Sequence, residues 1–328
     1  MPFPARLGTS GTHMVDANRN PVLLKGFDSI PVWRDHPGQT WGRDYYDRIA
    51  AKGFNAVRMV VYWSDMQPAP GTYSTTHLAT LDKAIATAKA AGLYVVLNPI
   101  LIYKMETYVP VWARTGDVLR DVELHAGPYL AMIARRYRGE SAVAAYDPLN
   151  EPPSSTSGGQ PAVLDAYRSM LDKIRAEDAD KIVMVEPAWG DSSLEGADFG
   201  RLGSTHNVVL SLHDYYAGGA GDGYRADGSQ EGVYTWDEVT GYPTPDAGAL
   251  EQHLVMNLKV AREADVPVWI GEFGVNSSAT NADLWVSHKV ELYKKYGLGY
   301  AWWLYQAGGG LSSMDSSYAF KPYVDRLL

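Results

Sequence analysis

The segment Val143-Ala144-Ala145-Tyr146-Asp147-Pro148-Leu149-Asn150-Glu151 carries the clearest fold signal, an apolar run with a carboxylate at its carboxyl end. Its apolar residues are mostly continuous, as expected of a parallel strand covered on both faces. Val268-Trp269-Ile270-Gly271-Glu272-Phe273-Gly274 has the same character. An ionised carboxylate that ends a buried strand requires polar partners or a water-filled site.

Similar runs recur along the chain and alternate with longer amphipathic stretches. We predict strands at Val22–Asp28, Asn55–Tyr62, Leu93–Ile100, Val143–Asn150, Ile182–Pro187, Val208–His213, Val266–Glu272 and Gly299–Trp303. Eight strands interleaved with helices, with no linker or repeat, favour one closed (β/α)8 TIM barrel of class α/β over residues 1–328.

The predicted helices place apolar residues at helical spacing. Leu78, Leu81, Ile85 and Ala88 share one face, and Gly92 follows as a stop. Further helices are predicted around Val122–Arg138, Val163–Glu177, Leu284–Tyr296 and Leu250–Ala261, with a short one near Leu194–Leu202.

Two other architectures suit a chain of 328 residues. Two ordinary domains would fit the length, but no linker divides the alternating units. A doubly wound open sheet would normally carry a glycine-rich phosphate loop after its first strand, and Gly26-Phe27-Asp28-Ser29 is not such a loop. The barrel is therefore the preferred prediction.

A short β-hairpin is predicted ahead of the barrel. Its strands would be Thr12–Val15 and Val22–Leu24, joined by the turn residues Asp16-Ala17-Asn18-Arg19-Asn20. This hairpin could close the amino-terminal end of the barrel. At the opposite, catalytic end, the long connections Leu101–Asp117 and Asp214–Asp246 follow strand ends and are expected to shape a cleft.

The composition excludes several classes of function. The formal net charge of −9 makes nucleic acid and anionic membranes unexpected partners. The absence of cysteine excludes disulfides, thiolate metal sites and cysteine nucleophiles. No run is long and apolar enough to span a bilayer, and no His/Asp/Glu cluster has metal-ligand spacing. We expect no metal and no cofactor.

The amino terminus, Met1-Pro2-Phe3-Pro4-Ala5-Arg6, lacks the apolar core of a signal peptide. The protein is therefore either cytoplasmic or secreted with its leader removed, and we expect the secreted form. Nothing in the sequence suggests an obligate interface, so a monomer is expected.

Glu151 and Glu272 end the fourth and seventh predicted strands, so they would face each other across the top of a barrel. Two facing carboxylates suit acetal cleavage, in which one protonates the departing oxygen and the other attacks or stabilises the oxocarbenium-like centre. Proximity should raise the pKa of one carboxyl and leave the other ionised. The alternative is a pair of helix N-caps or ion-paired glutamates.

A series of short motifs follows one order along nearly the whole chain. These motifs are Leu23-Leu24-Lys25-Gly26-Phe27, Gly53-Phe54-Asn55-Ala56-Val57-Arg58, the segment from Trp63 to Tyr73, Asn150-Glu151-Pro152, His213-Asp214-Tyr215, Gly271-Glu272-Phe273-Gly274 and Gly299-Tyr300-Ala301-Trp302-Trp303. Each is weak alone, but their joint order resembles family 5 of the glycoside hydrolases. The resemblance implies a retaining β-glycosidase, with its two glutamates on strands four and seven.

The resemblance also implies a role for each matching residue. Glu151 would be the acid/base and Glu272 the nucleophile. Arg58 would hold the Glu272 carboxylate by a charge-assisted hydrogen bond, although a barrel-end salt bridge is the alternative. Asn150 would hydrogen-bond the 2-hydroxyl of the sugar.

Three further residues would complete the site. By the same resemblance, His213 and Tyr215 would orient the nucleophile and line the subsite. Trp303 would stack beneath the reacting sugar. Trp302 is then expected in the core, although a misalignment by one residue would exchange the two tryptophans.

The chain departs from the family pattern after the third strand, where an Asp-x-His is frequent. Asn98 stands near the place of the aspartate and Ile100 near that of the histidine. Asn98 is kept as a candidate substrate-binding residue, and Tyr103 could fill the remaining space. This departure bears on the substrate more than on the reaction.

Five tryptophans near strand ends are candidate sugar platforms: Trp33, Trp41, Trp63, Trp112 and Trp189. Trp63 and Trp189 are the preferred ones. The substrate is expected to be a carbohydrate or a glycoconjugate, and the segment Trp63 to Tyr73 is similar to glycolipid-cleaving members. A transglycosidase with the same two glutamates and a catalytically idle sugar-binding barrel are the alternatives.

Overall fold

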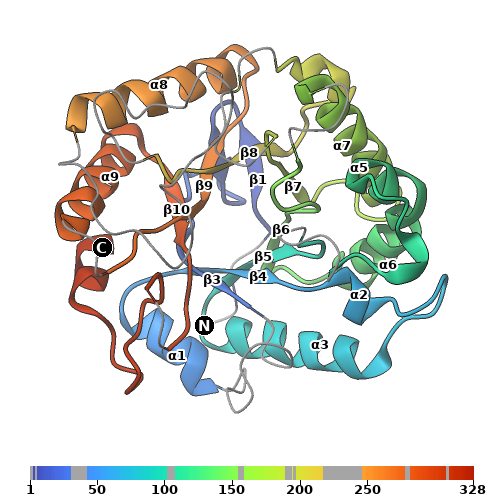
Figure 1. Cartoon of the computed structure of the whole chain (residues 1–328), viewed down its shortest axis with the longest axis horizontal. Coiled ribbons are helices and arrows are strands. Elements are labelled where there is room, and N and C mark those ends of the chain that lie inside the picture. The colour runs from blue at the N-terminus through green and yellow to red at the C-terminus, as the bar shows by residue number, and fades with distance from the viewer. Residues whose placement is uncertain are drawn as a thin grey trace.

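The computed structural model describes residues 3, 6–30, 43–101, 108–153, 159–188, 194, 197–216, 246–277, 281–307 and 310–328. Within these residues, eight parallel strands form a closed barrel surrounded by helices (Figure 1). The predicted fold class, a (β/α)8 barrel preceded by a hairpin, is confirmed.

The barrel strands run in the order β10-β3-β4-β5-β6-β7-β8-β9, and β10 closes the barrel by pairing with both β3 and β9. Their bounds are β3 Lys25–Ser29, β4 Ala56–Val60, β5 Tyr94–Asn98, β6 Val143–Tyr146, β7 Ile182–Val185, β8 Val208–His213, β9 Val268–Phe273 and β10 Gly299–Trp302. All eight predicted strands are present, most of them shorter than predicted.

The fourth predicted strand shows why the strands are shorter. β6 ends at Tyr146 instead of Asn150, because Pro148 has no N–H to continue the ladder. The chain nevertheless stays beside β5, since the Asp147 N–H donates to Leu97 O and the Asn150 N–H donates to Ile100 O, both at 2.9 Å. The segment that follows β6 is thus held at the carboxyl end of the barrel.

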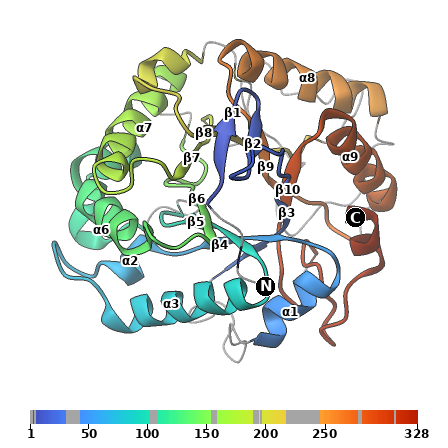
Figure 2. The same cartoon turned by 180° about the vertical axis from the view of Figure 1, so that it is seen from behind.

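Helices cover the outside of the barrel (Figures 1 and 2). The α-helices are α1 Arg43–Ala51, α2 Trp63–Met66, α3 Thr75–Ala90, α5 Val118–Asp121, α6 Gly127–Tyr137, α7 Gly159–Arg175, α8 Ala247–Glu263 and α9 Ala282–Tyr296. Short 3₁₀ turns are η1 Val111–Ala113, η3 Phe199–Leu202 and η4 Pro322–Leu327, and η2 Val122–Ala126 is a π-helical turn between α5 and α6.

The helix predictions are confirmed for α3, α7, α8 and α9, and the helix predicted around Val122–Arg138 is present as η2 followed by α6, while α1, α2 and α5 were not predicted. In α3, the predicted face is buried, the Ser74 side chain caps the amino terminus by accepting from the His77 N–H, and Gly92 follows the helix at φ +85°. The helix predicted near Leu194–Leu202 is only the turn η3.

The hairpin is present with different strands from those predicted. β1 (Gly8–Ser10) pairs antiparallel with β2 (His13–Val15). The predicted turn at 16–20 also forms, since Asp16 Oδ1 accepts from the N–H groups of Asn18 and Asn20, both at 2.8 Å. After it only an isolated bridge joins Pro21 to Val15, because a proline cannot donate to a ladder.

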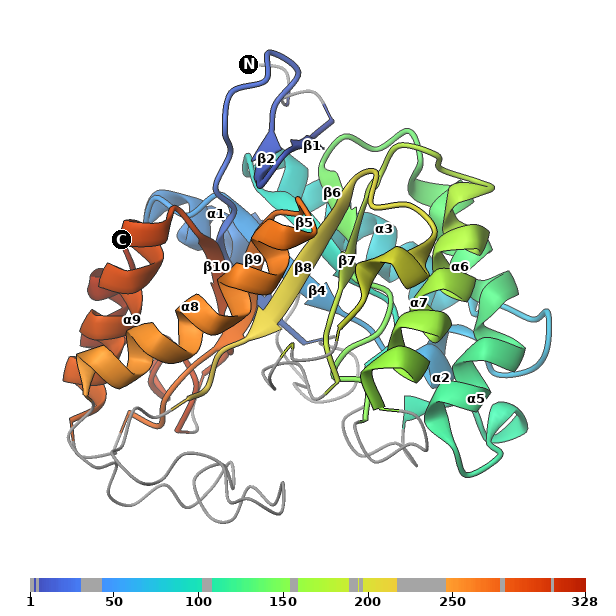
Figure 3. The same ribbon diagram turned by 90° about the horizontal axis from the view of Figure 1, so that it is seen from above.

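The hairpin closes the amino-terminal end of the barrel, as predicted (Figure 3). Leu7 and Met14 are buried and pack with inward-facing strand residues such as Ala56, Val96 and Met184. The outward-facing strand residues pack against the helices in a larger, separate cluster. The amino-terminal half of the interior is thus hydrocarbon, which leaves the carboxyl-terminal half for polar side chains.

Candidate active site

Glu151 and Glu272 lie at the carboxyl-terminal end of the barrel, as predicted. Glu151 follows β6 and its side chain is 20% exposed, whereas Glu272 is inside β9 and its side chain is 3% exposed. One carboxylate oxygen from each, together with a ring nitrogen of His213, lie within 4.8 Å of one another. The structure therefore brings two strand-end carboxylates into one small site.

A β-bulge in β9 turns Glu272 into the barrel. Ile270 pairs with Leu212 of β8 and Glu272 pairs with His213, so Gly271 is an extra residue. In a regular strand without the bulge, side chains two residues apart point to the same side, so Glu272 would point out of the barrel like Ile270. A side chain at Gly271 would place its Cβ 2.2 Å from Ser211 Oγ, which explains the glycine.

Arg58 is fully buried on β4 and organises the charged half of the interior. Its Nε donates to Asp147 Oδ2 at 2.7 Å. Its Nη1 donates to Asp28 Oδ1 at 3.0 Å and to Glu272 Oε1 at 2.8 Å. Its Nη2 donates to Asn150 Oδ1 at 2.7 Å and to Glu186 Oε1 at 3.0 Å. The predicted contact between Arg58 and Glu272 is therefore part of a larger network, in which four carboxylates surround one guanidinium.

This excess of buried negative charge changes the proton affinity of the carboxyls. Burial raises the pKa of Asp28 well above its usual value, against the opposing charge of Arg58. Burial and the nearby Glu186 carboxylate raise the pKa of Asp147 to about 7. Burial also raises the pKa of Glu272, although His213 and Arg58 oppose the shift. The network thus retains protons that exposed carboxyls would lose.

His213 lies between the carboxylates and is fully buried. Its Nδ1 is 2.9 Å from Glu151 Oε1 and 3.6 Å from Glu272 Oε2. Its Nε2 lies 3.3 Å from Glu186 Oε1, within ion-pair distance but without the alignment of a hydrogen bond. Burial lowers the pKa of the imidazole, but Glu186 and Glu272 outweigh it, and the net pKa lies well above its usual value.

Tyr215 and Asn150 complete the contacts around the two glutamates. The Tyr215 hydroxyl donates to Glu272 Oε2 at 2.9 Å, and burial keeps its pKa well above the usual value, so it stays a donor. Asn150 accepts from Arg58 through Oδ1, which leaves its amide nitrogen as the group available for a sugar hydroxyl. The structure thus brings both residues into the site.

Trp302 is the last residue of β10 and Trp303 directly follows it, and Trp302 lies in the core as predicted. Trp302 is fully buried, and its Nε1 donates to Leu311 O at 3.0 Å. Trp303 is only partly buried and packs against an apolar cluster of Val60, Tyr62 and Leu101. Its N–H donates to Phe273 O at 2.9 Å, which fixes it beside the β9 end that carries the nucleophile candidate.

Two predicted substrate-binding residues are placed elsewhere. Trp63 is fully buried: its Nε1 donates to Gln67 Oε1 at 2.8 Å and its ring is stacked with Tyr129, with 6.1 Å between centroids. The prediction that Trp63 is a sugar platform is wrong, because the turn α2 directs it into the core. Asn98 is also fully buried, and its Nδ2 donates to Asp147 O at 2.7 Å. It braces the end of β6 and has no surface for a substrate.

The other aromatic candidates stay predictions, because one is only partly buried and the rest lie outside the described residues. Trp112 is partly buried against Trp63 and donates from Nε1 to Gln67 O at 3.0 Å. Trp189, the other preferred platform, lies outside the described residues, as do Trp33, Trp41 and Tyr103. Trp189 therefore stays a prediction.

Asp28, Asp147 and Glu186 were missed by the sequence analysis. Each is an acidic residue at the carboxyl end of a predicted strand run, the same signal that singled out Glu151 and Glu272. All three are fully buried. Applied to every strand, that signal would have found them.

Among the described residues, one group of side chains has the spacing of a metal site, namely Glu151, His213 and Glu272. The Arg58 guanidinium already donates to Glu272 at 2.8 Å, and its positive charge would repel a cation bound there.

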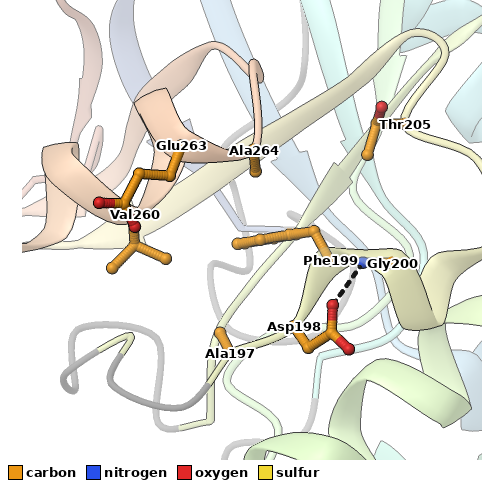
Figure 4. Close-up of a pocket in the computed structure, with 8 residues that line it drawn as sticks. All are labelled: Ala197, Asp198, Phe199, Gly200, Thr205, Val260, Glu263 and Ala264. Atoms are coloured by element: carbon orange, nitrogen blue, oxygen red, sulfur yellow. Dashed lines mark hydrogen bonds between the residues drawn. The ribbon is translucent and has the colours of Figure 1, made fainter.

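A hollow of about 280 Å³ lies between η3 and α8 (Figure 4). It is lined by Ala197, Asp198, Phe199, Gly200, Thr205, Val260, Glu263 and Ala264. The Asp198 carboxylate there caps η3 by accepting from the Gly200 N–H at 2.9 Å. The hollow is outside the barrel and holds none of the residues around Arg58.

In the part of the chain that the structure describes, no helix combines the length and the apolar character needed to cross a bilayer.

Comparison with known proteins bears on this arrangement. A family model described as cellulase (glycosyl hydrolase family 5) matches residues 15–309. Endoglycoceramidase I of Rhodococcus hoagii is 25% identical over 264 residues, which cover 64% of this chain and 52% of that protein. A probable glucan 1,3-β-glucosidase A of Aspergillus clavatus is 28% identical over 181 residues, covering 53% of this chain and 42% of that protein. The chain thus matches about half the length of these curated relatives.

Solved structures share the fold. A lactosyl-enzyme intermediate of endo-glycoceramidase II from Rhodococcus sp. superposes with a TM-score of 0.71 at 20% sequence identity, over 96% of this chain and 80% of that one. At this level of identity, the likeness concerns the barrel architecture.

Proposed function

Because the chain belongs to glycosyl hydrolase family 5, we propose that it cleaves β-glycosidic bonds with retention, using Glu151 as acid/base and Glu272 as nucleophile. The observation that carries the proposal is the approach of the two carboxylates, with an oxygen of each within 4.8 Å. Retaining enzymes place their carboxyl groups about 5–5.5 Å apart, whereas inverting enzymes need about 6.5–9.5 Å to admit a water.

The reaction would proceed in two displacements. Glu272 attacks the anomeric carbon and forms a glycosyl ester, while Glu151 gives its proton to the departing oxygen. Glu151 then takes a proton from water, and the water oxygen displaces Glu272 from the anomeric carbon. Both steps invert the centre, so the product keeps the starting configuration. Endo-glycoceramidase II, which shares the fold, supports this scheme because it forms a lactosyl-enzyme intermediate.

The surroundings of the two glutamates support this division of roles. Glu272 accepts a hydrogen bond on each oxygen, from Arg58 at 2.8 Å and from Tyr215 at 2.9 Å. Both donors favour the ionised form that a nucleophile needs, and they oppose the rise in the Glu272 pKa that burial causes. Glu151 is the more exposed of the pair and contacts His213, so it can exchange its proton with solvent between turnovers.

We further propose that the substrate is a glycoconjugate with an apolar aglycone. The similarity to endoglycoceramidase I supports this substrate class. In the site, partly buried Ile30 and Tyr108 pack on the same apolar cluster as Trp303. An apolar wall beside the proposed sugar platform suits a lipid-linked sugar better than a long glucan, although the glucosidase relative makes glucan the comparison substrate.

The test is a substrate screen with two inactivating controls. Glycosphingolipids, aryl β-lactosides and β-cellobiosides, and β-1,3-glucan oligosaccharides are incubated with the parent, Glu151→Gln and Glu272→Gln proteins. We expect cleavage by the parent only, fastest on the glycolipid, with the β-anomer as the first product by NMR. An initial α-anomer, or full activity in Glu272→Gln, would contradict the mechanism.

The same screen separates the alternatives. Transfer of the sugar to an added alcohol in preference to water would indicate a transglycosidase. Tight sugar binding with no cleavage of any substrate would indicate an idle barrel.

A further inference from the structure

Glu186 contacts three groups of the proposed machinery although the family pattern in the sequence does not mark it. It follows β7 directly and is fully buried. Its Oε2 accepts from the Glu151 N–H at 2.6 Å, and its Oε1 lies 3.0 Å from Arg58 Nη2 and 3.3 Å from His213 Nε2. A buried carboxylate with these contacts acts on its neighbours with little screening by water.

We propose that Glu186 is a positioning residue that fixes the main chain of the acid/base Glu151 and holds a proton on the Glu151–His213 pair. The inference rests on the function proposed above for Glu151 and Glu272. Glu186 itself would not touch the substrate, because its side chain is fully buried and has no exposed surface.

The first part of the proposal follows from the backbone of Glu151. Its φ is +43°, a left-handed conformation that residues with a side chain rarely adopt. Such a conformation persists only where the surroundings impose it. The hydrogen bond from the Glu151 N–H to Glu186 provides one such restraint.

Tyr167 of α7 adds to the restraint that Glu186 places on the main chain of Glu151. Its hydroxyl accepts from the Glu186 N–H at 3.0 Å and donates to Leu149 O at 2.8 Å. The main chain of Glu186 is therefore tied to the segment that ends in Glu151. The direction of the Glu151 side chain thus depends on Glu186 through two connected hydrogen-bond paths.

The second part follows from the charges around His213. The groups that face or act on its ring are Glu151 and Asp147 after β6, Glu186 after β7, Glu272 on β9, Asp28 on β3 and Arg58 on β4. Glu186 is the carboxylate nearest to Nε2, and Glu151 is nearest to Nδ1. A carboxylate at Nε2 favours the cationic ring, whose Nδ1–H then donates to Glu151. Loss of the Glu186 charge would make the proton of the pair easier to lose.

The first variant, Glu186→Gln, removes the charge but keeps the shape and an oxygen able to accept from the Glu151 N–H. Using the best aryl glycoside of the screen, we expect the alkaline limb of the kcat/KM profile to move by about one unit toward lower pH. A purely structural role would lower activity at every pH without moving the limb. An unmoved limb in the folded variant overturns the electrostatic part.

The second variant, Glu186→Asp, keeps the charge but withdraws it from the Glu151 N–H. We expect kcat/KM to fall by about tenfold or more for aryl glycosides with poor leaving groups, because these depend on the acid. Dinitrophenyl glycosides, whose leaving group needs no proton, should be cleaved at nearly the parental kcat/KM. Equal losses for both substrates would overturn the positioning part.

The controls separate the failure of this inference from the failure of the proposed function. Glu291→Gln, an exposed change on α9, should behave as the parent. Activity retained in Glu151→Gln and Glu272→Gln would refute the proposed function itself. If those two are inactive while both Glu186 variants keep the parental pH profile and leaving-group dependence, only the role of Glu186 is refuted. Should Glu186→Gln not fold, the leaving-group dependence of Glu186→Asp decides.

Discussion

The two ends of the barrel interior are built from the same strands and have opposite chemistry. At the amino-terminal end, Ala56 on β4 and Met184 on β7 pack in hydrocarbon against the hairpin. Arg58 lies two residues after Ala56, and Glu186 lies two residues after Met184; these two side chains form a buried ion pair at 3.0 Å. One step of the strand repeat thus changes the interior from apolar to charged.

This contrast shows how a barrel can separate stability from chemistry. Apolar burial at the closed end stabilises the fold. Burying several charges at the open end costs free energy unless each charge is paired and hydrogen-bonded. Arg58 offsets part of that cost, but burial, together with the neighbouring carboxylates, still raises the pKa values of Asp28, Asp147 and Glu272. The charged end should therefore control activity, and the apolar end stability alone.

The largest expected effect is on activity at the charged end. Glu272→Gln should lower kcat by at least about 10⁴-fold, because removal of a nucleophile eliminates the covalent step. The free energy of unfolding should stay equal or rise slightly, since a buried negative charge is removed from an overcharged cluster. Steady-state kinetics and urea unfolding measure the two effects. A large loss of stability would show that Glu272 has a structural role.

The next effect is on stability at the same end. Arg58→Met should lower the free energy of unfolding by about 3–5 kcal/mol near neutral pH, because four carboxylates lose their common cation. The loss should be smaller at pH 5, where the carboxyls can bind protons. Arg58→Lys keeps one charge but not five acceptor contacts, so it should fall between the parent and Arg58→Met. Equal losses at pH 5 and pH 7 would mean that packing, not charge, dominates.

At the amino-terminal end, which the hairpin closes, a substitution should lower stability without changing activity. Met14→Ala removes a buried side chain from the hairpin and should cost roughly 2–4 kcal/mol of stability. Well below the unfolding temperature, kcat and KM should stay at the parental values, because the change is separated from the site by the apolar layer. A changed kcat with intact fold would disprove the separation of the two ends.

The pH dependence of stability sharpens the comparison further. Asp147 has a folded pKa of about 7 against an ordinary value of 3.8, so between these values the folded state keeps a proton that the unfolded chain has lost. Stability should therefore fall as pH rises from about 4 to 7, by at most about 1.4 kcal/mol per unit for this group. His213, whose pKa is also raised, adds a decline above its ordinary value of 6.5.

Asp147→Asn isolates this contribution. The amide oxygen can still accept from Arg58 Nε, but the titration is removed, so unfolding curves between pH 4 and pH 7 should show a shallower slope. Asp82→Asn is the matched control: the pKa of Asp82 is lowered by its hydrogen bond from Arg136, so that group contributes stability that is lost only as pH falls below its ordinary value. An unchanged slope in Asp147→Asn would contradict the assignment.

The difference between the two ends also explains what the sequence could reveal. The strands and the facing glutamates were predictable because continuous apolar runs ending in acids are local signals. The Arg58–Glu272 contact was predicted from the family resemblance, but the convergence of the other acceptors on Arg58 was not, because they come from different strands and meet only through the register of the closed barrel. The bulge at Gly271, which turns Glu272 inward, left only a glycine within a strand as its trace.

Substitution of Trp63 should have the smallest effect, and it tests an ambiguity of the sequence. A tryptophan that follows a strand gives the same sequence pattern whether its side chain faces the cleft or the core. Its burial against Tyr129 and its hydrogen bond to Gln67 predict that Trp63→Phe costs about 1–2 kcal/mol of stability with no change in KM. Trp303→Phe, at the partly exposed position, should instead raise KM or lower kcat at nearly constant stability. Thermal unfolding and kinetics on both variants would decide, and a raised KM in Trp63→Phe would return that residue to the substrate cleft.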